Sequence, residues 1–140
     1  MVKVLFADNH AVVRDGIRRI LADDSRVEVV GEAADFSEAI TQAQQITPDV
    51  LVVDPHMPFE PDLSLCELSA QLNSCGAGIL GISFTNDDDA RLLATSMGAA
   101  ELLDKTQLGK ELIPSIMRVA SARNGFSPVV SVKPSNRSEL

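Results

Sequence analysis

Hydrophobic and polar residues alternate along the chain between two kinds of segment. Short apolar runs predict strands at residues 2–8, 27–33, 50–54, 78–83 and 101–105. Three of these runs are almost continuously apolar, as expected of parallel strands that are covered on both faces. Between the runs, apolar residues recur every three or four positions. This spacing predicts helices over about residues 12–21, 38–47, 63–72, 86–98 and 108–123.

Several polar residues and one proline mark where these helices begin and end. Ser37 is a candidate N-cap for the second helix, and the acidic run Asp87–Asp89 is typical of the first turn of the fourth. Gly98 is placed to end the fourth helix. Pro114 falls inside the last helical pattern, so we expect it either in the first turn of that helix or at a bend.

The alternation of strands and helices predicts a single α/β domain over residues 1–123. Short alternating units of this kind build parallel sheets through right-handed crossovers. Residues 124–140 are rich in Gly, Pro, Ser and Asn, and they are expected to form a linker or tail. A chain of 140 residues is long enough for one such domain to bury a core.

Composition narrows the classes of function. The net charge of −8 argues against direct nucleic-acid binding by this chain, because phosphates would be repelled. Cys66 and Cys75 form no C-x-x-C pair and are expected to be free thiols in a reducing compartment. No apolar run reaches the length of a membrane span, and no signal peptide is evident, so a cytoplasmic location is expected.

Polar side chains follow the predicted strands at their carboxyl ends. The first strand ends in Asp8, Asn9 and His10, and the third ends in Asp54. The fourth ends in Ser83 and the fifth in Lys105, with Thr85 just beyond Ser83. Ligands and chemistry collect at this edge of an open parallel sheet, so these groups are expected to converge.

The chemistry of this set points to phosphoryl transfer. Clustered carboxylates suit Mg²⁺, which takes oxygen ligands and keeps several waters. A lysine and a hydroxyl facing the same point suit phosphoryl oxygens, and a carboxylate there can act as the nucleophile. Neither His10 nor His56 is expected to bind a transition metal, because no cysteine or further histidine accompanies them.

Four stretches, "VLFADNH", "VVDPHMP", "ISFTNDDD" and "GAAELLDK", resemble the signature segments of bacterial response-regulator receiver domains, in order and at matching separations. The resemblance covers residues 2 to about 123, and residues 27–54 are similar in sequence to the NarL/FixJ subfamily. It implies a flavodoxin-like (CheY-like), doubly wound sheet of five parallel strands in the order 2-1-3-4-5, with helices on both faces.

The resemblance also implies roles for individual residues. Asp54 is the expected phosphoacceptor, and Asp8 and Asp54 are expected Mg²⁺ ligands. Ser83 takes the place of the hydroxyl residue that senses the phosphoryl group, and Lys105 that of the lysine that pairs with it. The backbone carbonyl of His56 is expected to complete the metal site; no organic cofactor is expected.

The sequence departs from the family pattern at several of these places. Asn9 replaces the second acidic residue, which is expected to weaken Mg²⁺ binding. Leu102 stands where the family has an aromatic switch residue. The loop "MPFEPDLSL" lacks the usual glycine and is stiffened by Pro61. The His56 side chain and Thr85 are expected to flank the attacking water and tune dephosphorylation.

The function implied by the resemblance is that of a signalling domain, at most catalysing its own phosphotransfer and dephosphorylation. Its expected partners are a sensor histidine kinase and a DNA-binding output domain of the LuxR type, outside this chain, which regulates transcription. A homodimer is expected through the first and last helices, or through the face of the fourth helix, fifth strand and fifth helix.

Two other classes of function remain as alternatives. The first is a pseudo-receiver, a protein-interaction module that works without phosphorylation, which Asn9 and Leu102 would favour. The second is a flavodoxin-like small-molecule binder. That class needs a glycine-rich phosphate loop after the first strand, and "DNHAVVRDG" does not provide one.

Overall fold

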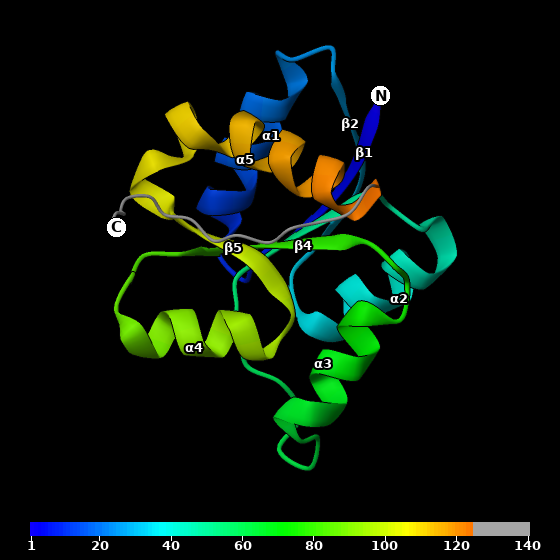
Figure 1. The fold of residues 1–140 in the computed structure, drawn as a ribbon, viewed down its shortest axis with the longest axis vertical. Coiled ribbons are helices and arrows are strands. Elements are labelled where there is room, and N and C mark those ends of the chain that lie inside the picture. Colours follow the sequence, from blue (N-terminus) through cyan, green and yellow to red (C-terminus); the bar gives the residue numbers. More distant parts are fainter. Residues whose placement is uncertain (125–140) are drawn as a thin grey trace.

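The computed structural model describes residues 1–124, which form one five-stranded sheet covered by helices on both faces (Figure 1). All neighbouring strands are parallel, and their order is β2-β1-β3-β4-β5. The strands are β1 (Val2–Ala7), β2 (Val27–Ala33), β3 (Val50–Val53), β4 (Gly78–Ser83) and β5 (Ala99–Asp104). The fold class and strand order predicted from the sequence are confirmed.

Helices α1 and α5 cover one face of the sheet, and α2, α3 and α4 cover the other (Figure 1). The helices are α1 (Ala11–Ala22), α2 (Phe36–Ile46), α3 (Leu65–Asn73), α4 (Asp88–Ser96) and α5 (Leu108–Asn124), with a short 3₁₀ turn η1 (Lys105–Gln107) before α5. The five predicted helices are therefore confirmed, with ends that shift by one or two residues.

The sheet separates two hydrophobic clusters because successive side chains of a strand point to opposite faces. Val4 and Phe6 face α1 and α5, whereas Leu5 and Ala7 face α2 and α3. The central strand β3 is buried along its whole length, which is why it reads as an unbroken apolar run. Burial of each large side chain contributes about 1.5–3 kcal/mol.

Local capping sets the helix ends more closely than hydrophobic spacing does. Asp35, and not Ser37 as predicted, is the N-cap of α2, and its side chain accepts a hydrogen bond from the Glu38 amide. Ser64 and Glu67 form a reciprocal capping box at the start of α3. Asp87 caps α4, so the prediction that the acidic run begins a helix is confirmed.

The last helix runs through Pro114 and continues to Asn124. Pro114 lies well beyond the first turn, where its ring nitrogen cannot donate to the carbonyl four residues earlier. The predicted linker was placed at residues 124–140, but Asn124 still belongs to the helix. Residues 125–140 lie outside the part of the chain that the structure describes.

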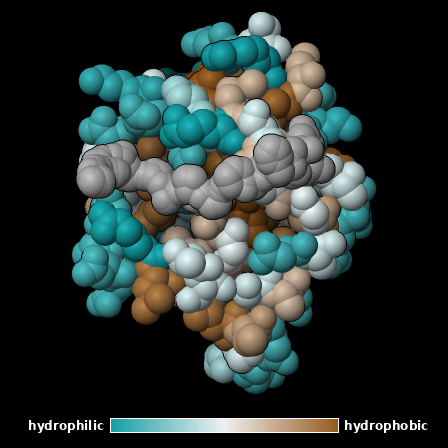
Figure 2. Space-filling view, in the orientation of Figure 1, coloured by the Kyte–Doolittle hydropathy of each residue, from teal (hydrophilic) through white to brown (hydrophobic). Residues whose placement is uncertain are grey.

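Other features of the described chain bear on the expectations from composition. Cys66 and Cys75 are free. Between residues 1 and 124, no helix combines the length and the apolar character needed to cross a membrane. On the face shown in Figure 2, hydrophobic residues form separate patches between hydrophilic ones.

Two glycines offer a matched test of backbone conformation. Gly98 follows α4 with φ of +89°, and a Cβ there would lie 2.6 Å from Asn73 Nδ2. We expect Gly98→Ala to lower the free energy of unfolding by about 1–2 kcal/mol, because alanine is strained at positive φ. Gly16 lies inside α1 with no atom near its would-be Cβ, so Gly16→Ala should add about 0.5–1 kcal/mol.

Urea unfolding followed by far-ultraviolet circular dichroism measures both changes, since the chain contains no tryptophan or tyrosine. Equal effects of the two substitutions would contradict the assignment of Gly98 to a left-handed position.

Candidate functional site

The predicted site residues meet at the carboxyl edge of the sheet. Asp8 follows β1 and Asp54 follows β3, and these strands pair in register up to Ala7 and Val53. The Asp54 amide donates to the Ala7 carbonyl at 3.2 Å, which holds the two carboxylates side by side. Because the strands are parallel and adjacent, residues far apart in sequence reach the same edge.

Lys105 joins the two carboxylates in one buried cluster. Its Nζ lies 2.6 Å from Asp8 Oδ2 and 2.7 Å from Asp54 Oδ2, and all three side chains are almost fully buried. Although Asp8 Oδ2 touches the ammonium, it accepts no hydrogen bond of good geometry from the described residues. Two negative charges therefore share one positive charge in a place with little access to water, and a further cation would be stabilised there.

Backbone amides fix the direction of each carboxylate. The His56 amide donates to Asp54 Oδ1 at 2.8 Å, and the His10 amide donates to Asp8 Oδ1 at the same distance. In both cases the residue two positions further on holds one oxygen, which leaves the other oxygen facing Lys105. Sequence reasoning placed the carboxylates at strand ends but did not predict this matched pair of turns.

The 3₁₀ turn η1 presents Lys105 toward the carboxylates. Asp104 caps this turn, and its Oδ1 accepts hydrogen bonds of 2.8 Å from both the amide and the hydroxyl of Thr106. The hydrogen bond from the Thr106 amide holds the pKa of Asp104 below its usual range. Lys105 also lies 4.8 Å from the centre of the Phe84 ring, a contact that favours a cation over an aromatic face.

Ser83 lies at the same edge but bonds within its own loop. Its Oγ accepts a hydrogen bond of 3.1 Å from the Thr85 amide and lies 3.2 Å from Thr85 Oγ1. Thr85 Oγ1 is in turn 3.5 Å from His56 Nε2, at the outer limit of a hydrogen bond. The structure thus brings the two predicted tuning residues together, and both are exposed.

Leu102 packs beside Gly81 on the face that α4 covers. The two residues pair in register between β5 and β4, and a Cβ on Gly81 would lie 3.0 Å from Leu102 Cδ1 and 3.5 Å from Ala94 Cβ. The missing side chain of Gly81 therefore makes room for Leu102. Its role as a switch residue stays a prediction.

An arginine cluster supports the site from α1. Arg14 Nη1 donates to the Asp8 carbonyl at 2.7 Å, and its Nε donates to Glu32 Oε2 at 3.0 Å. Arg18 also binds Glu32, and hydrogen bonds from Arg18 are the main cause of the lowered pKa of Glu32. The cluster connects α1, β2 and the backbone of Asp8.

The donor atoms present fit a hard divalent cation. Carboxylate oxygens of Asp8 and Asp54 and a ring nitrogen of His10 all lie within 4.8 Å of one another. Asn9 follows Asp8 directly and is exposed. The two carboxylates carry one more negative charge than Lys105 balances, and Mg²⁺ would neutralise it. Asp8 Oδ2, which accepts no hydrogen bond from the described residues, could serve as a ligand.

Phe84 is a residue of this site that was not predicted from the sequence, and the contact of His10 with Asp8 was not predicted either, although His10 was expected at this edge. His10 lies with its Nδ1 3.2 Å from Asp8 Oδ1, and Phe84 covers Lys105 although 61% of its own surface is exposed. The signal for Phe84 was an aromatic residue directly after the predicted strand end Ser83. The contact of His10 with Asp8 could not be predicted, because the direction of the ring depends on the turn at Asp8.

Known proteins resemble this chain in sequence and in structure. The sequence model of the response regulator receiver domain family matches residues 4–117 of this chain. Response regulator protein VraR of Staphylococcus aureus is 32% identical over 138 residues, which cover 97% of this chain and 65% of VraR. The chain thus spans about two thirds of the length of such curated relatives.

Two solved structures show the same fold. The signal receiver domain of the response regulator NarL from Mycobacterium tuberculosis superposes with a TM-score of 0.74 at 29% identity, covering 86% of this chain and 96% of that one. A LuxR-family two-component response regulator from Aurantimonas sp. also gives a TM-score of 0.74, at 28% identity and with 91% of each chain covered. This chain therefore belongs to the response regulator receiver domain family.

Proposed function

We propose that this domain accepts a phosphoryl group on Asp54 and thereby controls an output domain. The observation that carries the proposal is the buried cluster in which Lys105 lies within 2.7 Å of both Asp54 and Asp8. A carboxylate held in this way, beside a buried positive charge, is suited to attack phosphorus and to have its product stabilised.

The steps follow from the groups that surround Asp54. One of its carboxylate oxygens forms the new bond to phosphorus as the bond to the donor nitrogen of a kinase phosphohistidine breaks. Lys105 pairs with the incoming phosphoryl oxygens, and Ser83 turns from Thr85 toward them. Bound Mg²⁺ supplies positive charge to the phosphoryl oxygens. Asp8, Asn9 and the His56 carbonyl would hold it together with Asp54.

The signal is proposed to leave through the elements next to the site. Movement of Ser83 and Lys105 would shift the population of conformations of α4, β5 and α5, since these residues end β4 and begin η1. We propose that this shift favours dimers, through that face or through α1 and α5, and that it controls a DNA-binding output domain of the LuxR type. The proposed partner is a sensor histidine kinase, and the proposed location of this domain is the cytoplasm.

The proposal is tested by intact-mass spectrometry of the protein after incubation with acetyl phosphate and Mg²⁺. We expect a mass increase of one phosphoryl group, absent when a chelator removes the metal. Hydroxylamine should remove the adduct, because acyl phosphates react with it. A protein that stays unmodified under these conditions would favour the alternative of a receiver that works without phosphorylation.

Asn9 provides a separate prediction about the metal. In Asn9→Asp a third carboxylate is added directly after Asp8, so Mg²⁺ affinity should rise about tenfold if position 9 reaches the metal. Isothermal titration calorimetry with Mg²⁺ measures this directly, without any phosphoryl donor. The exposed Asn86→Asp is a control of equal charge, and it should leave the affinity unchanged. Equal affinities of wild type and Asn9→Asp would show that position 9 does not reach the metal.

A further inference from the structure

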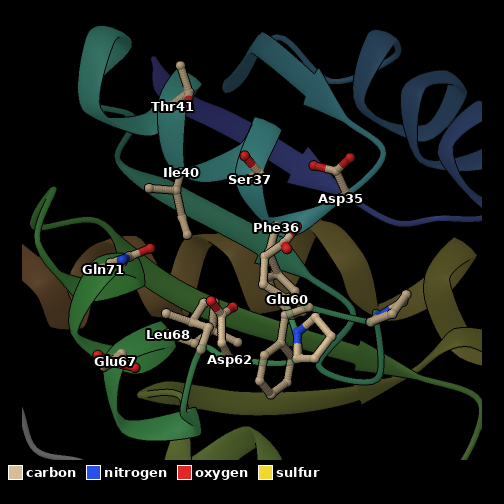
Figure 3. A pocket seen from close by; sticks show the side chains of 14 residues that line it. Asp35, Phe36, Ser37, Ile40, Thr41, Glu60, Asp62, Glu67, Leu68 and Gln71 are labelled. Carbon is tan, nitrogen blue, oxygen red and sulfur yellow. The ribbon is translucent and has the colours of Figure 1, made fainter.

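A groove lies between α2, α3 and the loop that connects β3 to α3, away from the carboxylate cluster. It has a volume of about 730 Å³ and is open to solvent (Figure 3). One wall is formed by residues of α2 and its N-cap, and the other by the six residues from Pro58 to Leu63; the first wall consists of Asp35, Phe36, Ser37, Ile40 and Thr41. Leu68 and Gln71 of α3 complete it, as Figure 3 shows.

The floor of the groove is apolar and belongs to the hydrophobic core. Phe36 and Leu68 are buried, and Ile40 is partly buried at the edge of the same hydrophobic cluster. The ring of Phe59 meets that of Phe36 edge to face, with centroids 6.1 Å apart, yet 36% of Phe59 remains exposed. The groove therefore offers hydrophobic surface, with Phe59 held between the interior and solvent.

The charged residues that line the groove are all acidic. Asp35, Glu60, Asp62 and Glu67 line it, and no lysine or arginine does. The same imbalance extends along the sequence, since residues 27–90 contain twelve carboxylates and all twelve basic residues of the chain lie elsewhere. The groove thus has an apolar floor and an acidic rim. No lysine or arginine within residues 27–90 balances the negative charge of that rim.

We propose that this groove is a docking site for a cationic segment of a partner protein, one that places an apolar side chain on Phe36 and Ile40 and lysines or arginines against the acidic rim. Apolar anchors surrounded by complementary charge are a common way to bind a short peptide. Nucleic acids and anionic membranes carry the wrong charge for this rim. The site needs no phosphorylation.

The basic residues of a second copy of this chain suit the groove less well. Within residues 1–124, six arginines are already paired with carboxylates of their own chain, which leaves few exposed cations to offer: Arg14, Arg18, Arg19, Arg26, Arg91 and Arg118. Breaking these pairs would offset the gain from new ones. A partner segment with unpaired lysines or arginines meets no such cost.

The test uses a fluorescein-labelled peptide of leucines and lysines in helical spacing as the probe, with a peptide of leucines and glutamates as its counterpart. Fluorescence anisotropy should show saturable binding of the lysine peptide alone, weaker as salt is added. The double substitution Glu60→Lys/Asp62→Lys should lower the affinity about tenfold. Its control, Asp23→Lys/Glu28→Lys, changes the net charge equally at exposed positions outside the groove and should change affinity less than twofold.

A second variant separates hydrophobic anchoring from general attraction between opposite charges. Phe59→Ala removes the half-exposed ring and leaves every charge in place, so it should also weaken the peptide about tenfold. Circular dichroism of each variant confirms that it is folded. In nuclear magnetic resonance spectra, the amide resonances of residues 35–41 and 58–68 should change their chemical shifts when the peptide is added.

Three results would overturn the proposal. The first is no saturable binding of the lysine peptide to the wild type. The second is an equal loss of affinity in the control double variant, which would mean that attraction follows the net charge of the chain. The third is self-association of the protein alone in analytical ultracentrifugation that Glu60→Lys/Asp62→Lys abolishes, which would identify a second copy as the occupant.

Discussion

Replacement of Asp54 by asparagine is expected to abolish the phosphoryl adduct formed with acetyl phosphate and Mg²⁺. The amide keeps the shape of the side chain and its contact with the His56 amide, but its oxygen is a poor nucleophile. Intact-mass spectrometry should therefore show only the unmodified mass for Asp54→Asn, under conditions that modify the wild type.

The matched control for this experiment is Asp62→Asn, which removes an exposed carboxylate that is not part of the cluster. It should be modified to the same extent as the wild type. If the adduct persists in Asp54→Asn, the acceptor is another carboxylate, and Asp8 would be the first to examine because it shares Lys105. Such a result would contradict the assigned role of Asp54 without affecting the family assignment.

Removal of the Lys105 ammonium is expected to have the largest effect on stability. In Lys105→Met two buried carboxylates lose the one cation that pairs with both, so the free energy of unfolding should fall by about 3 kcal/mol. Urea unfolding followed by circular dichroism measures the change. Lys110→Met, at an exposed position of α5, is the control and should stay within about 0.5 kcal/mol of the wild type.

Two further measurements test whether Lys105→Met loses stability because of unpaired charge or because of altered packing. Adding Asp54→Asn to Lys105→Met removes one of the unpaired charges, so the double variant should recover part of the lost stability. Mg²⁺ should stabilise Lys105→Met more than the wild type, because it replaces the missing positive charge. A double variant that is less stable than Lys105→Met, together with equal effects of Mg²⁺, would contradict this account of the cluster.

Much of the fold could be predicted from the sequence because its signals are local. The run from Val50 to Val53 reads as a buried strand, since both of its faces must be apolar in a covered parallel sheet. Gly98 after a helical pattern predicts a helix end, and the structure places it at positive φ. The N-cap of α2 was predicted wrongly, because both Asp35 and Ser37 are good capping residues and only the direction of the chain after β2 selects Asp35.

The sequence allowed most residues of the site to be predicted, but not the ion pairs and hydrogen bonds between them. Asp8, Asp54 and Lys105 each follow a strand and Ser83 ends one, and the parallel order brings strand ends to one edge. That Lys105 binds both carboxylates, while Ser83 bonds to Thr85, depends on turns and side-chain rotamers set by packing. The position of Phe84 over Lys105 depends on the same packing.

By itself, then, the sequence determined the α/β architecture, the strand ends that carry the site and the uneven distribution of charge. Periodicity and composition are properties of neighbouring residues, so they can be read along the chain. Only the tertiary structure decided which oxygen of Asp54 faces Lys105 and that Phe59 closes a groove against Phe36. Those contacts join residues that are distant in sequence, and their geometry exists only after the sheet and helices have packed.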